Sequence, residues 1–250
     1  MTIALETRRL RKSFGALTVA DGIDFSLEGG ARHALIGPNG AGKTTLVNLL
    51  TGALAPSSGQ IYLEGEDVTS LAQAKRVRRG IGRTFQINSL FRSLTVLDNV
   101  ALAVAERTGA ARKLFRPAFS HDEVKDEAHA LLGSLGLSDD ASRAVRDLAY
   151  GKQRLVEIAI ALGMRPRVLL LDEPAAGVPS AESHRILEVL AALPPEIAIL
   201  IIEHDMDLVF RFARRITVLA AGAILMEGSP QEVAHDARVR QVYLGERAHV

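Results

Sequence analysis

A glycine-rich segment, GPNGAGKTT, carries residue types that bind phosphate. It matches the pattern G-x-x-x-x-G-K-S/T, with Lys43 and Thr44 at the last two positions, and it lies between an apolar run and a helix-like run. Its glycines let the backbone approach phosphate oxygens closely, Lys43 supplies a charge to the outer phosphates, and the Thr44 hydroxyl is a ligand for Mg²⁺. The segment therefore predicts a site for a nucleoside triphosphate with Mg²⁺. The predicted site comprises Gly37, Pro38, Asn39, Gly40, Ala41, Gly42, Lys43, Thr44 and Thr45.

Two carboxylates, Asp172 and Glu173, follow the apolar run RVLLL. The carboxyl end of a parallel strand faces the ligand crevice of its sheet. At such a position Asp172 can hold Mg²⁺, and Glu173 can take a proton from the water that attacks the terminal phosphate. A carboxylate pair at a strand end is a weak indication alone, but beside the phosphate loop it predicts hydrolysis of the bound nucleotide.

A second candidate anion site lies in LAYGKQR, residues 148–154, which opens the apolar, helix-like run LVEIAIAL. Gly151 sits where the helix should begin, and Lys152 and Gln153 follow it directly. The free N–H groups at a helix N-terminus carry about half a positive charge and bind anions. One nucleotide needs one phosphate cradle, so the second cradle requires an explanation of its own.

Short β-like runs alternate with helix-like segments, as in an α/β sheet with parallel strands. The expected strands cover residues 2–10, 23–28, 32–37, 60–65, 167–173, 198–204 and 215–222. The expected helices cover residues 44–52, 120–137, 152–164 and 180–193. In the second of these helices, Ser120 and Glu123 have the spacing of a capping box, and an apolar face runs from Val124 to Leu135.

The alternation of strands and helices stops between about Ser89 and Gly151. There the sequence pattern is almost wholly helical and contains the basic-aromatic patch ARKLFRPAF. A helical lobe inserted into the α/β core is the simplest explanation of this change.

The composition excludes several classes of function. The 250 residues carry a formal net charge of +1, which gives no electrostatic basis for binding nucleic acid. We interpret the basic clusters Arg8–Lys12, Lys75–Arg79 and Arg214–Arg215 as solvated surface. Cysteine is absent, which excludes disulfides and fits a reducing, cytosolic compartment. No secretory signal is expected at the N-terminus, and the apolar run Ile216–Met226 is far shorter than the ~20 residues of a membrane span. Any membrane role should therefore come through a partner.

With the phosphate loop, LAYGKQR, LLLDEP and IIEH in this order, the chain resembles the nucleotide-binding subunits of ABC transporters over nearly its whole length. The resemblance implies an α/β fold: a P-loop NTPase of ABC type, with a mostly parallel sheet flanked by helices, an inserted helical lobe and an antiparallel β part. It implies a single ABC ATPase domain over residues 1–250, whose helical subdomain, about 89–150, bears the signature motif at its end. The implied cofactors are ATP and Mg²⁺.

The resemblance also implies roles for matching residues. Gln86, in RTFQ, matches the Q-loop glutamine, which touches Mg²⁺ and the attacking water and couples the site to the membrane subunits. His204, in IIEHD, matches the switch histidine that contacts the γ-phosphate, and Phe14, in KSFG, matches the aromatic residue that stacks on adenine. The implied catalytic residues are Glu173, His204, Lys43 and Gln86. The implied Mg²⁺ ligands are Thr44, Gln86 and Asp172.

LAYGKQR occupies the place of the signature motif, usually LSGGQ, which serves the nucleotide of a second subunit in a head-to-tail dimer. The second cradle is thus implied to be for the partner's phosphate. Its implied contacts come from Ala149, Tyr150, Gly151, Lys152 and Gln153. Ala149 replaces a serine whose hydrogen bond to a charged phosphate would be worth about 1.5–3 kcal/mol. Tyr150 replaces a glycine, Lys152 a glutamine, and Pro179 stands where the D-loop aspartate is expected.

LAYG, DEPAAG, IIEHDMDLV and the C-terminal VYLGE resemble, more narrowly, the ATPases of branched-chain amino-acid importers and their urea and amide relatives. This implies solute import through integral membrane permease subunits, a second ABC ATPase chain in a hetero- or homodimer and, indirectly, a periplasmic or lipoprotein solute-binding protein. It implies a peripheral location on the cytoplasmic face of the inner or plasma membrane. The altered signature favours a heterodimer with a partner that carries the fuller motif.

Three alternatives stay open. They are the ATPase of a lipid or lipopolysaccharide exporter, a soluble ABC ATPase of the cluster-assembly type, and a small-molecule P-loop kinase. The last would leave LAYGKQR and IIEHD unexplained.

Overall fold

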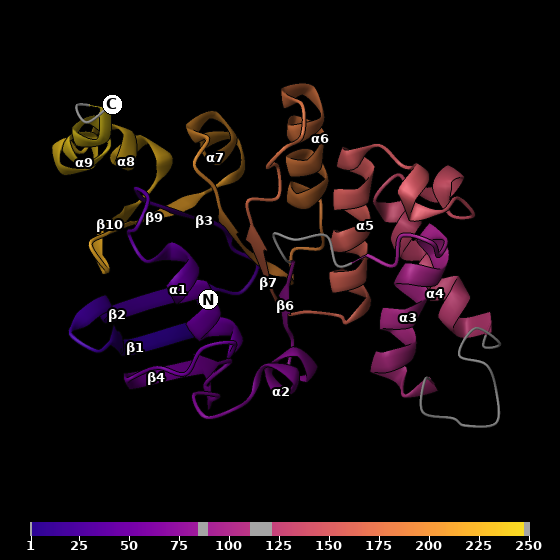
Figure 1. Cartoon of the computed structure of the whole chain (residues 1–250), viewed down its shortest axis with the longest axis horizontal. Coiled ribbons are helices and arrows are strands. Elements are labelled where there is room, and N and C mark those ends of the chain that lie inside the picture. Colours follow the sequence, from indigo (N-terminus) through magenta and orange to yellow (C-terminus); the bar gives the residue numbers. More distant parts are fainter. Residues whose placement is uncertain (1, 85–89, 111–121, 248–250) are drawn as a thin grey trace.

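The computed structural model describes residues 2–84, 90–110 and 122–247. Its strands form two sheets, one of four antiparallel strands and one of six mostly parallel strands. Figure 1 shows the sheets toward the left and centre, with helices α3, α4 and α5 grouped on the right. The predicted α/β fold, with its mostly parallel sheet, antiparallel β part and helical lobe, is confirmed.

The six-stranded sheet has the order β10-β9-β3-β8-β7-β6, and only β10 and β9 pair in antiparallel fashion. Every residue of β3, β8 and β7 is buried, as expected for apolar strands covered on both faces. The order places the carboxyl ends of these three strands side by side, so the segments that follow them meet at one edge. The strand bounds are β3 Arg32–Ile36, β6 Ile81–Arg83, β7 Val168–Asp172, β8 Ala198–Ile202, β9 Arg215–Ala220 and β10 Ala223–Gly228.

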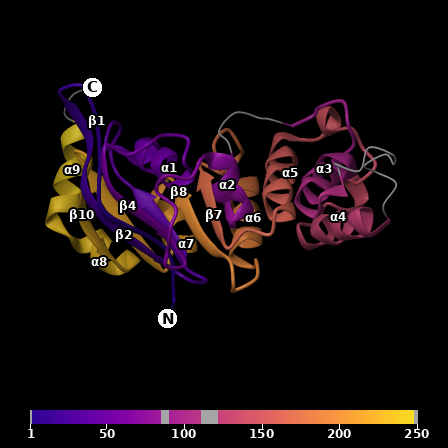
Figure 2. The same ribbon diagram turned by 90° about the horizontal axis from the view of Figure 1, so that it is seen from below.

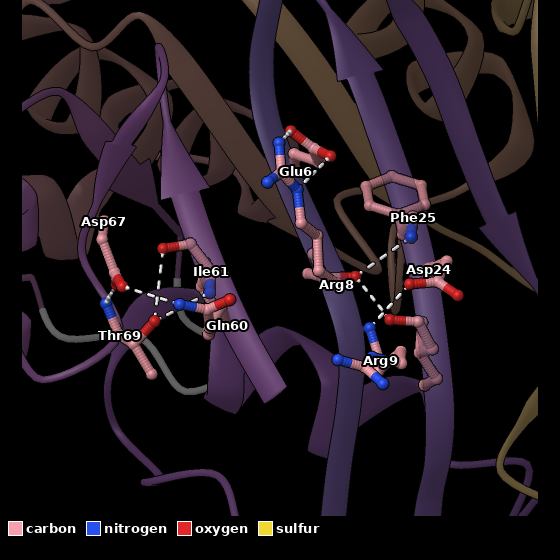
Figure 3. Close-up of polar contacts among 11 residues, drawn as sticks. Glu6, Arg8, Arg9, Asp24, Phe25, Gln60, Ile61, Asp67 and Thr69 are labelled. Carbon is pink, nitrogen blue, oxygen red and sulfur yellow. Dashed lines mark hydrogen bonds and ion pairs between the residues drawn. The ribbon is translucent and has the colours of Figure 1, made fainter. Parts of the chain in front are cut away.

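The four-stranded sheet has the order β2-β1-β4-β5. The register of β1 with β2 shifts around Arg9, which has a φ of 45° and donates its backbone N–H to Asp24 Oδ1 at 2.6 Å. Figure 3 shows this contact and, beside it, the backbone N–H of Ile61 bonded to the Thr69 hydroxyl. Short polar side chains therefore hold the irregular parts of this sheet. The strand bounds are β1 Ile3–Phe14, β2 Leu17–Glu28, β4 Ser58–Leu63 and β5 Glu66–Asp67.

Helix α1, Lys43–Thr51, lies between the two sheets (Figure 1). Its buried leucines and valine share one hydrophobic cluster with Leu5 and Ile23 of the antiparallel sheet and with Leu35 and Leu200 of the parallel one. The helix that begins at the phosphate loop is therefore fixed by packing on both sides.

Helix α2, Gln73–Arg78, contains a buried cation. Arg76 is only 1% exposed, and its Nη1 donates to the carbonyls of Leu49 and Leu50 at 2.7 and 2.9 Å. The interpretation of Lys75–Arg79 as solvated surface is therefore wrong for Arg76. The carbonyls at the end of α1 need donors, and the guanidinium supplies them.

Three helices form the group on the right of Figure 1 and pack on one another. The apolar face predicted for α4 is confirmed, because Val124, Ala128 and Leu132 are buried there. The capping residue expected at Ser120 lies outside the described residues. The bounds are α3 Val96–Thr108, α4 Asp122–Ser134 and α5 Tyr150–Gly163.

Between α4 and α5 the chain forms only two short 3₁₀ turns, η3 at Ser138–Asp140 and η4 at Val145–Asp147. The expectation that residues 89–151 are almost wholly helical is wrong in this stretch. Figure 2 shows the same helices at one end of an elongated molecule, with the antiparallel sheet at the other.

The remaining helices cover the parallel sheet. Of these, the sequence predicted α6 alone. Helix α7 begins after Asp205, whose side chain accepts hydrogen bonds from two N–H groups of the first turn. Within the described segments no helix has the length and apolar character needed to cross a membrane. The bounds are α6 Ser180–Ala191, α7 Met206–Phe212, α8 Pro230–His235 and α9 Ala237–Arg247.

Candidate functional site

The phosphate loop connects the buried strand β3 to α1. The Lys43 ammonium bends back over the loop and donates to the carbonyls of Gly37 and Pro38 at 2.6 and 2.9 Å. Gly42 is the N-cap of α1 and has no side chain to occupy the first-turn N–H groups, and that turn contains no acidic residue. The loop therefore combines a lysine with a helix N-terminus that no side chain caps, an arrangement suited to an anion.

The glycines of this loop are required by close backbone contacts. A Cβ on Gly37 would lie 2.2 Å from the Leu219 carbonyl oxygen, and one on Gly42 would lie 2.6 Å from the Val19 carbonyl oxygen. Both positions have positive φ, at 155° and 101°. The loop thus rests directly on β9 and β2, which fixes its shape.

Asp172 is the last residue of β7 and is 5% exposed. Its Oδ2 lies 3.2 Å from Nη2 of Arg83, whose Nη1 donates to Asn48 Oδ1 at 2.6 Å. Arg83 thereby connects the end of β6, the end of β7 and helix α1. The carboxylate predicted to hold Mg²⁺ is therefore paired with a cation that also contacts the helix after the phosphate loop.

Glu173 follows Asp172 and has a φ of 48°, in the left-handed region that residues other than glycine adopt at a cost of about 1–3 kcal/mol. Its backbone N–H donates to the Ile202 carbonyl at 2.9 Å. The Glu173 Oε1 lies 3.7 Å from Nδ1 of His204, and His204 is largely exposed. The structure therefore brings together two predicted catalytic residues from the ends of β7 and β8.

The segment LAYGKQR begins α5 with Ala149 as its N-cap, and no side chain caps the helix. The Lys152 ammonium lies 2.5 Å from Oδ2 of the nearly buried Asp140 and holds the pKa of that carboxyl below its usual range. The buried side chain of Gln153 donates to the Leu148 carbonyl at 2.9 Å. Lys152 and Gln153 thus have partners within the lobe, and no side chain caps the N–H groups of the first turn.

Tyr150 and Gly151 pack against the loop that follows Glu173. A Cβ on Gly177 would lie 3.3 Å from the Tyr150 ring. A Cβ on Gly151 would lie 2.2 Å from the Glu182 carboxylate of α6 and 3.4 Å from Val178. The start of α5 and this loop are therefore in direct contact within one chain.

Of the other residues predicted for the site, the structure describes Phe14 and Pro179. Phe14 ends β1 and is 51% exposed, and Nζ of Lys12 lies over its ring, 5.0 Å from the centroid. Pro179 is the N-cap of α6. Gln86 lies outside the described residues.

The donors present fit Mg²⁺. Thr44 is exposed at the start of α1, and Asp172 supplies a carboxylate that Arg83 connects to Asn48, one turn further along the same helix. The described parts of the chain contain no group of three or more His, Cys, Asp or Glu side chains that could hold a metal. A Mg²⁺ ion at this site would take further ligands from phosphate and water, as this ion usually does.

Sequence reasoning missed three residues that shape this site. Arg83 forms an ion pair with Asp172, and Asp140 forms one with Lys152. Glu203 accepts a hydrogen bond from the backbone N–H of Ala175. Only Glu203 had a visible signal, since a charged residue directly follows the apolar run AILII and precedes His204. The other two contacts depend on tertiary structure.

Comparisons with known proteins agree with this geometry. The family model of the ABC transporter matches residues 20–176, and a model of the branched-chain amino acid ATP-binding cassette transporter matches residues 223–249. The high-affinity branched-chain amino acid transport ATP-binding protein BraF of Pseudomonas aeruginosa is 39% identical over 249 residues, which cover 97% of this chain and 98% of BraF.

Two solved structures show the same fold. The ADP conformation of MJ1267, an ATP-binding cassette of an ABC transporter, superposes with a TM-score of 0.86 at 33% identity and covers 98% of this chain and 100% of its own. A dimeric post-hydrolysis state of the cassette MJ0796, bound to ADP and Pi, gives a TM-score of 0.74 at 25% identity and covers 90% of this chain and 98% of its own. The chain belongs to the ABC transporter family, as one of its ATP-hydrolysing ATP-binding cassettes.

Proposed function

We propose that this chain is the ATP-hydrolysing subunit of an importer that takes up branched-chain amino acids or related small polar solutes through separate membrane subunits. The observation that carries the ATPase part is the strand order β3-β8-β7, which places the phosphate loop, His204 and the Asp172–Glu173 pair at one sheet edge. The importer part is supported by BraF, a branched-chain amino acid transport protein that the chain matches over nearly its whole length.

In this proposal each residue has a separate role. Lys43 and the loop N–H groups stabilise the charge that develops on the phosphates, and Phe14 stacks on the adenine. Glu173 accepts a proton from the attacking water, and His204 holds the γ-phosphate beside it. Mg²⁺, held by Thr44, Asp172 and Gln86, would neutralise phosphate charge.

We further propose that the N-terminus of α5, which carries the signature segment LAYGKQR, binds the phosphate of the nucleotide held by a second ATPase chain. The open N–H groups at the start of α5 support this role, as does the dimeric state of the cassette MJ0796. Ala149 offers no hydroxyl, and Lys152 is paired with Asp140. A heterodimer with a partner that carries the fuller motif is therefore the favoured arrangement.

The remaining parts of the proposal concern location and organisation. The chain would lie on the cytoplasmic face of the inner or plasma membrane, bound to permease subunits and supplied by a periplasmic or lipoprotein solute-binding protein, with no nucleic acid involved. Residues 1–250 would form one ABC ATPase domain with a helical subdomain at about 89–150. The packing of α3, α4 and α5 on one another supports that subdomain.

The test is an affinity pull-down of the tagged chain from gently solubilised membranes, with the untagged strain as the control. Multi-spanning membrane subunits together with a second, LSGGQ-type ATPase are the expected result. Membrane subunits of a lipid exporter, or soluble proteins alone, would overturn the importer proposal. A tight ATP-dependent homodimer of Glu173→Gln, as stable as those of LSGGQ proteins, would overturn the heterodimer.

A further inference from the structure

Glu203 is a buried carboxylate between β8 and His204. It is 2% exposed, whereas most glutamates lie on protein surfaces. Its Oε1 accepts a hydrogen bond from the backbone N–H of Ala175 at 3.2 Å. Burying a carboxyl group costs desolvation free energy, so the hydrogen bond that Glu203 makes requires an explanation.

The contact joins two segments that carry proposed catalytic residues. Ala175 is two residues after Glu173, and Glu203 directly precedes His204. A second bond, from the Glu173 N–H to the Ile202 carbonyl at 2.9 Å, runs alongside it. Two hydrogen bonds, one at Glu173 and one two residues later at Ala175, therefore join the segment after β7 to the end of β8.

Glu173 needs this support because its backbone is strained. Its φ of 48° persists only where surrounding contacts over-determine the conformation. The Ala176 N–H donates a hydrogen bond to the Glu173 carbonyl at 3.0 Å, which closes a tight turn directly after the strand. Without an acceptor at residue 203, the preceding N–H of that turn, on Ala175, would be buried and unpaired.

We propose that Glu203 is a positioning residue that holds the turn after β7 so that Glu173 faces His204. The inference rests on the proposed function, because it assigns Glu173 and His204 to the reaction. Glu203 touches neither nucleotide nor water in this role. It acts through backbone N–H groups, chiefly that of Ala175 and also that of His204.

The surroundings of Glu203 agree with this role. Burial raises the pKa of its carboxyl, and the backbone N–H groups of Ala175 and His204 partly offset that rise. The oxygen that accepts from Ala175 is available whether the group is charged or neutral. A glutamine at this position keeps an acceptor of the same reach, which gives the experiment a conservative variant.

The test compares Glu203→Met, which keeps the side-chain volume but removes the acceptor, with Glu203→Gln, which keeps it. Exposed Glu196→Met is the matched control. ATP turnover, nucleotide affinity and hydrogen exchange of residues 173–178 are measured on the full chain with the subunits that co-purify with it. Should Glu203→Met fail to fold, Glu203→Ala, which also lacks an acceptor, replaces it.

In Glu203→Met, kcat should fall at least tenfold, because misplacement of about 1 Å can cost ~100-fold, while KM for ATP stays within about twofold. Exchange of the 173–178 segment should rise about tenfold. Glu203→Gln should restore both readouts to within about threefold of the wild type. Glu173→Gln is measured in parallel.

Three outcomes separate the possible failures. Wild-type turnover in Glu173→Gln would overturn the proposed function itself. Loss of turnover in Glu173→Gln, with wild-type kcat or unchanged exchange in Glu203→Met, would overturn only the role of Glu203. A Glu203→Gln variant as impaired as Glu203→Met would also overturn it, since the acceptor would not be what matters.

Discussion

Replacing Arg76 by methionine should destabilise the protein severely, although Arg76 belongs to a short basic run. The guanidinium makes four hydrogen bonds to backbone carbonyls: Nη1 to Leu49 and Leu50 at 2.7 and 2.9 Å, Nε to Leu71 at 2.9 Å and Nη2 to Thr69 at 2.8 Å. Its positive charge also lies at the C-terminal end of α1, where a cation is favourable.

The magnitude follows from these contacts. Hydrogen bonds that involve a charged group are worth about 1.5–3 kcal/mol each, so four would contribute about 6–12 kcal/mol. Desolvation of the buried guanidinium of Arg76 offsets several kcal/mol of this gain. The variant should therefore lose about 3–5 kcal/mol, the cost of breaking a buried charged contact while its partners stay in place.

The assay is the midpoint of thermal unfolding. In a chain of this size each kcal/mol shifts the midpoint by about 2–4 °C, so Arg76→Met should unfold roughly 6–20 °C below the wild type. Arg78→Met is the matched control, because Arg78 is exposed and its one ion pair, with Glu106 at 3.5 Å, should be worth less than about 1 kcal/mol. A midpoint for Arg76→Met equal to that of Arg78→Met would refute the reasoning.

Three further predictions concern the phosphate loop, the lobe and the adenine site. Gly37→Ala should abolish nucleotide binding in a titration, because its Cβ would lie 2.2 Å from a backbone oxygen of β9; retained binding would contradict this. Asp140→Asn should lower the unfolding midpoint at pH 7. The ammonium of Lys152 depresses the folded-state pKa of Asp140 below its unfolded value of about 3.9. The stabilisation is therefore present above about pH 4 and lost as the pH falls through the folded-state pKa. A difference between the unfolding midpoints of Asp140→Asn and the wild type that persists below the folded-state pKa would contradict the pairing. Phe14→Ala should weaken ATP binding about tenfold or more, as expected for a lost base stack, with little change in stability; Leu17→Ala, also exposed, is the control.

The sequence predicted those parts of the fold whose burial pattern is local. Strands β3, β7 and β8 are continuous apolar runs, and α4 repeats apolar residues on one face. The short strand β6 has no such pattern and exists because it pairs with β7. Helix α7 buries Leu208, Val209 and Phe212 on one face, but a run of seven residues is too short to distinguish a helix from a strand by its apolar pattern, and the cap from Asp205 marks where it begins.

The same distinction applies to the site. Lys43, Asp172 and Glu173 stand in motifs whose spacing reflects local geometry, so their types were sufficient to predict where they lie. The ion pair of Asp140 with Lys152 joins residues that are close in space only through the turns before α5, and no motif marks it. The strained φ of Glu173 is also invisible in the sequence, because no glycine or asparagine marks that position.

The central claim is that this chain hydrolyses ATP with Glu173 as the base and Lys43 in the phosphate loop. The most direct measurement is ATP turnover and ATP affinity of the wild type, Glu173→Gln and Lys43→Ala, determined on the same preparations. We expect Glu173→Gln to bind ATP as the wild type does but to lose turnover, and Lys43→Ala to lose both. Wild-type turnover in Glu173→Gln, or wild-type affinity in Lys43→Ala, would contradict it.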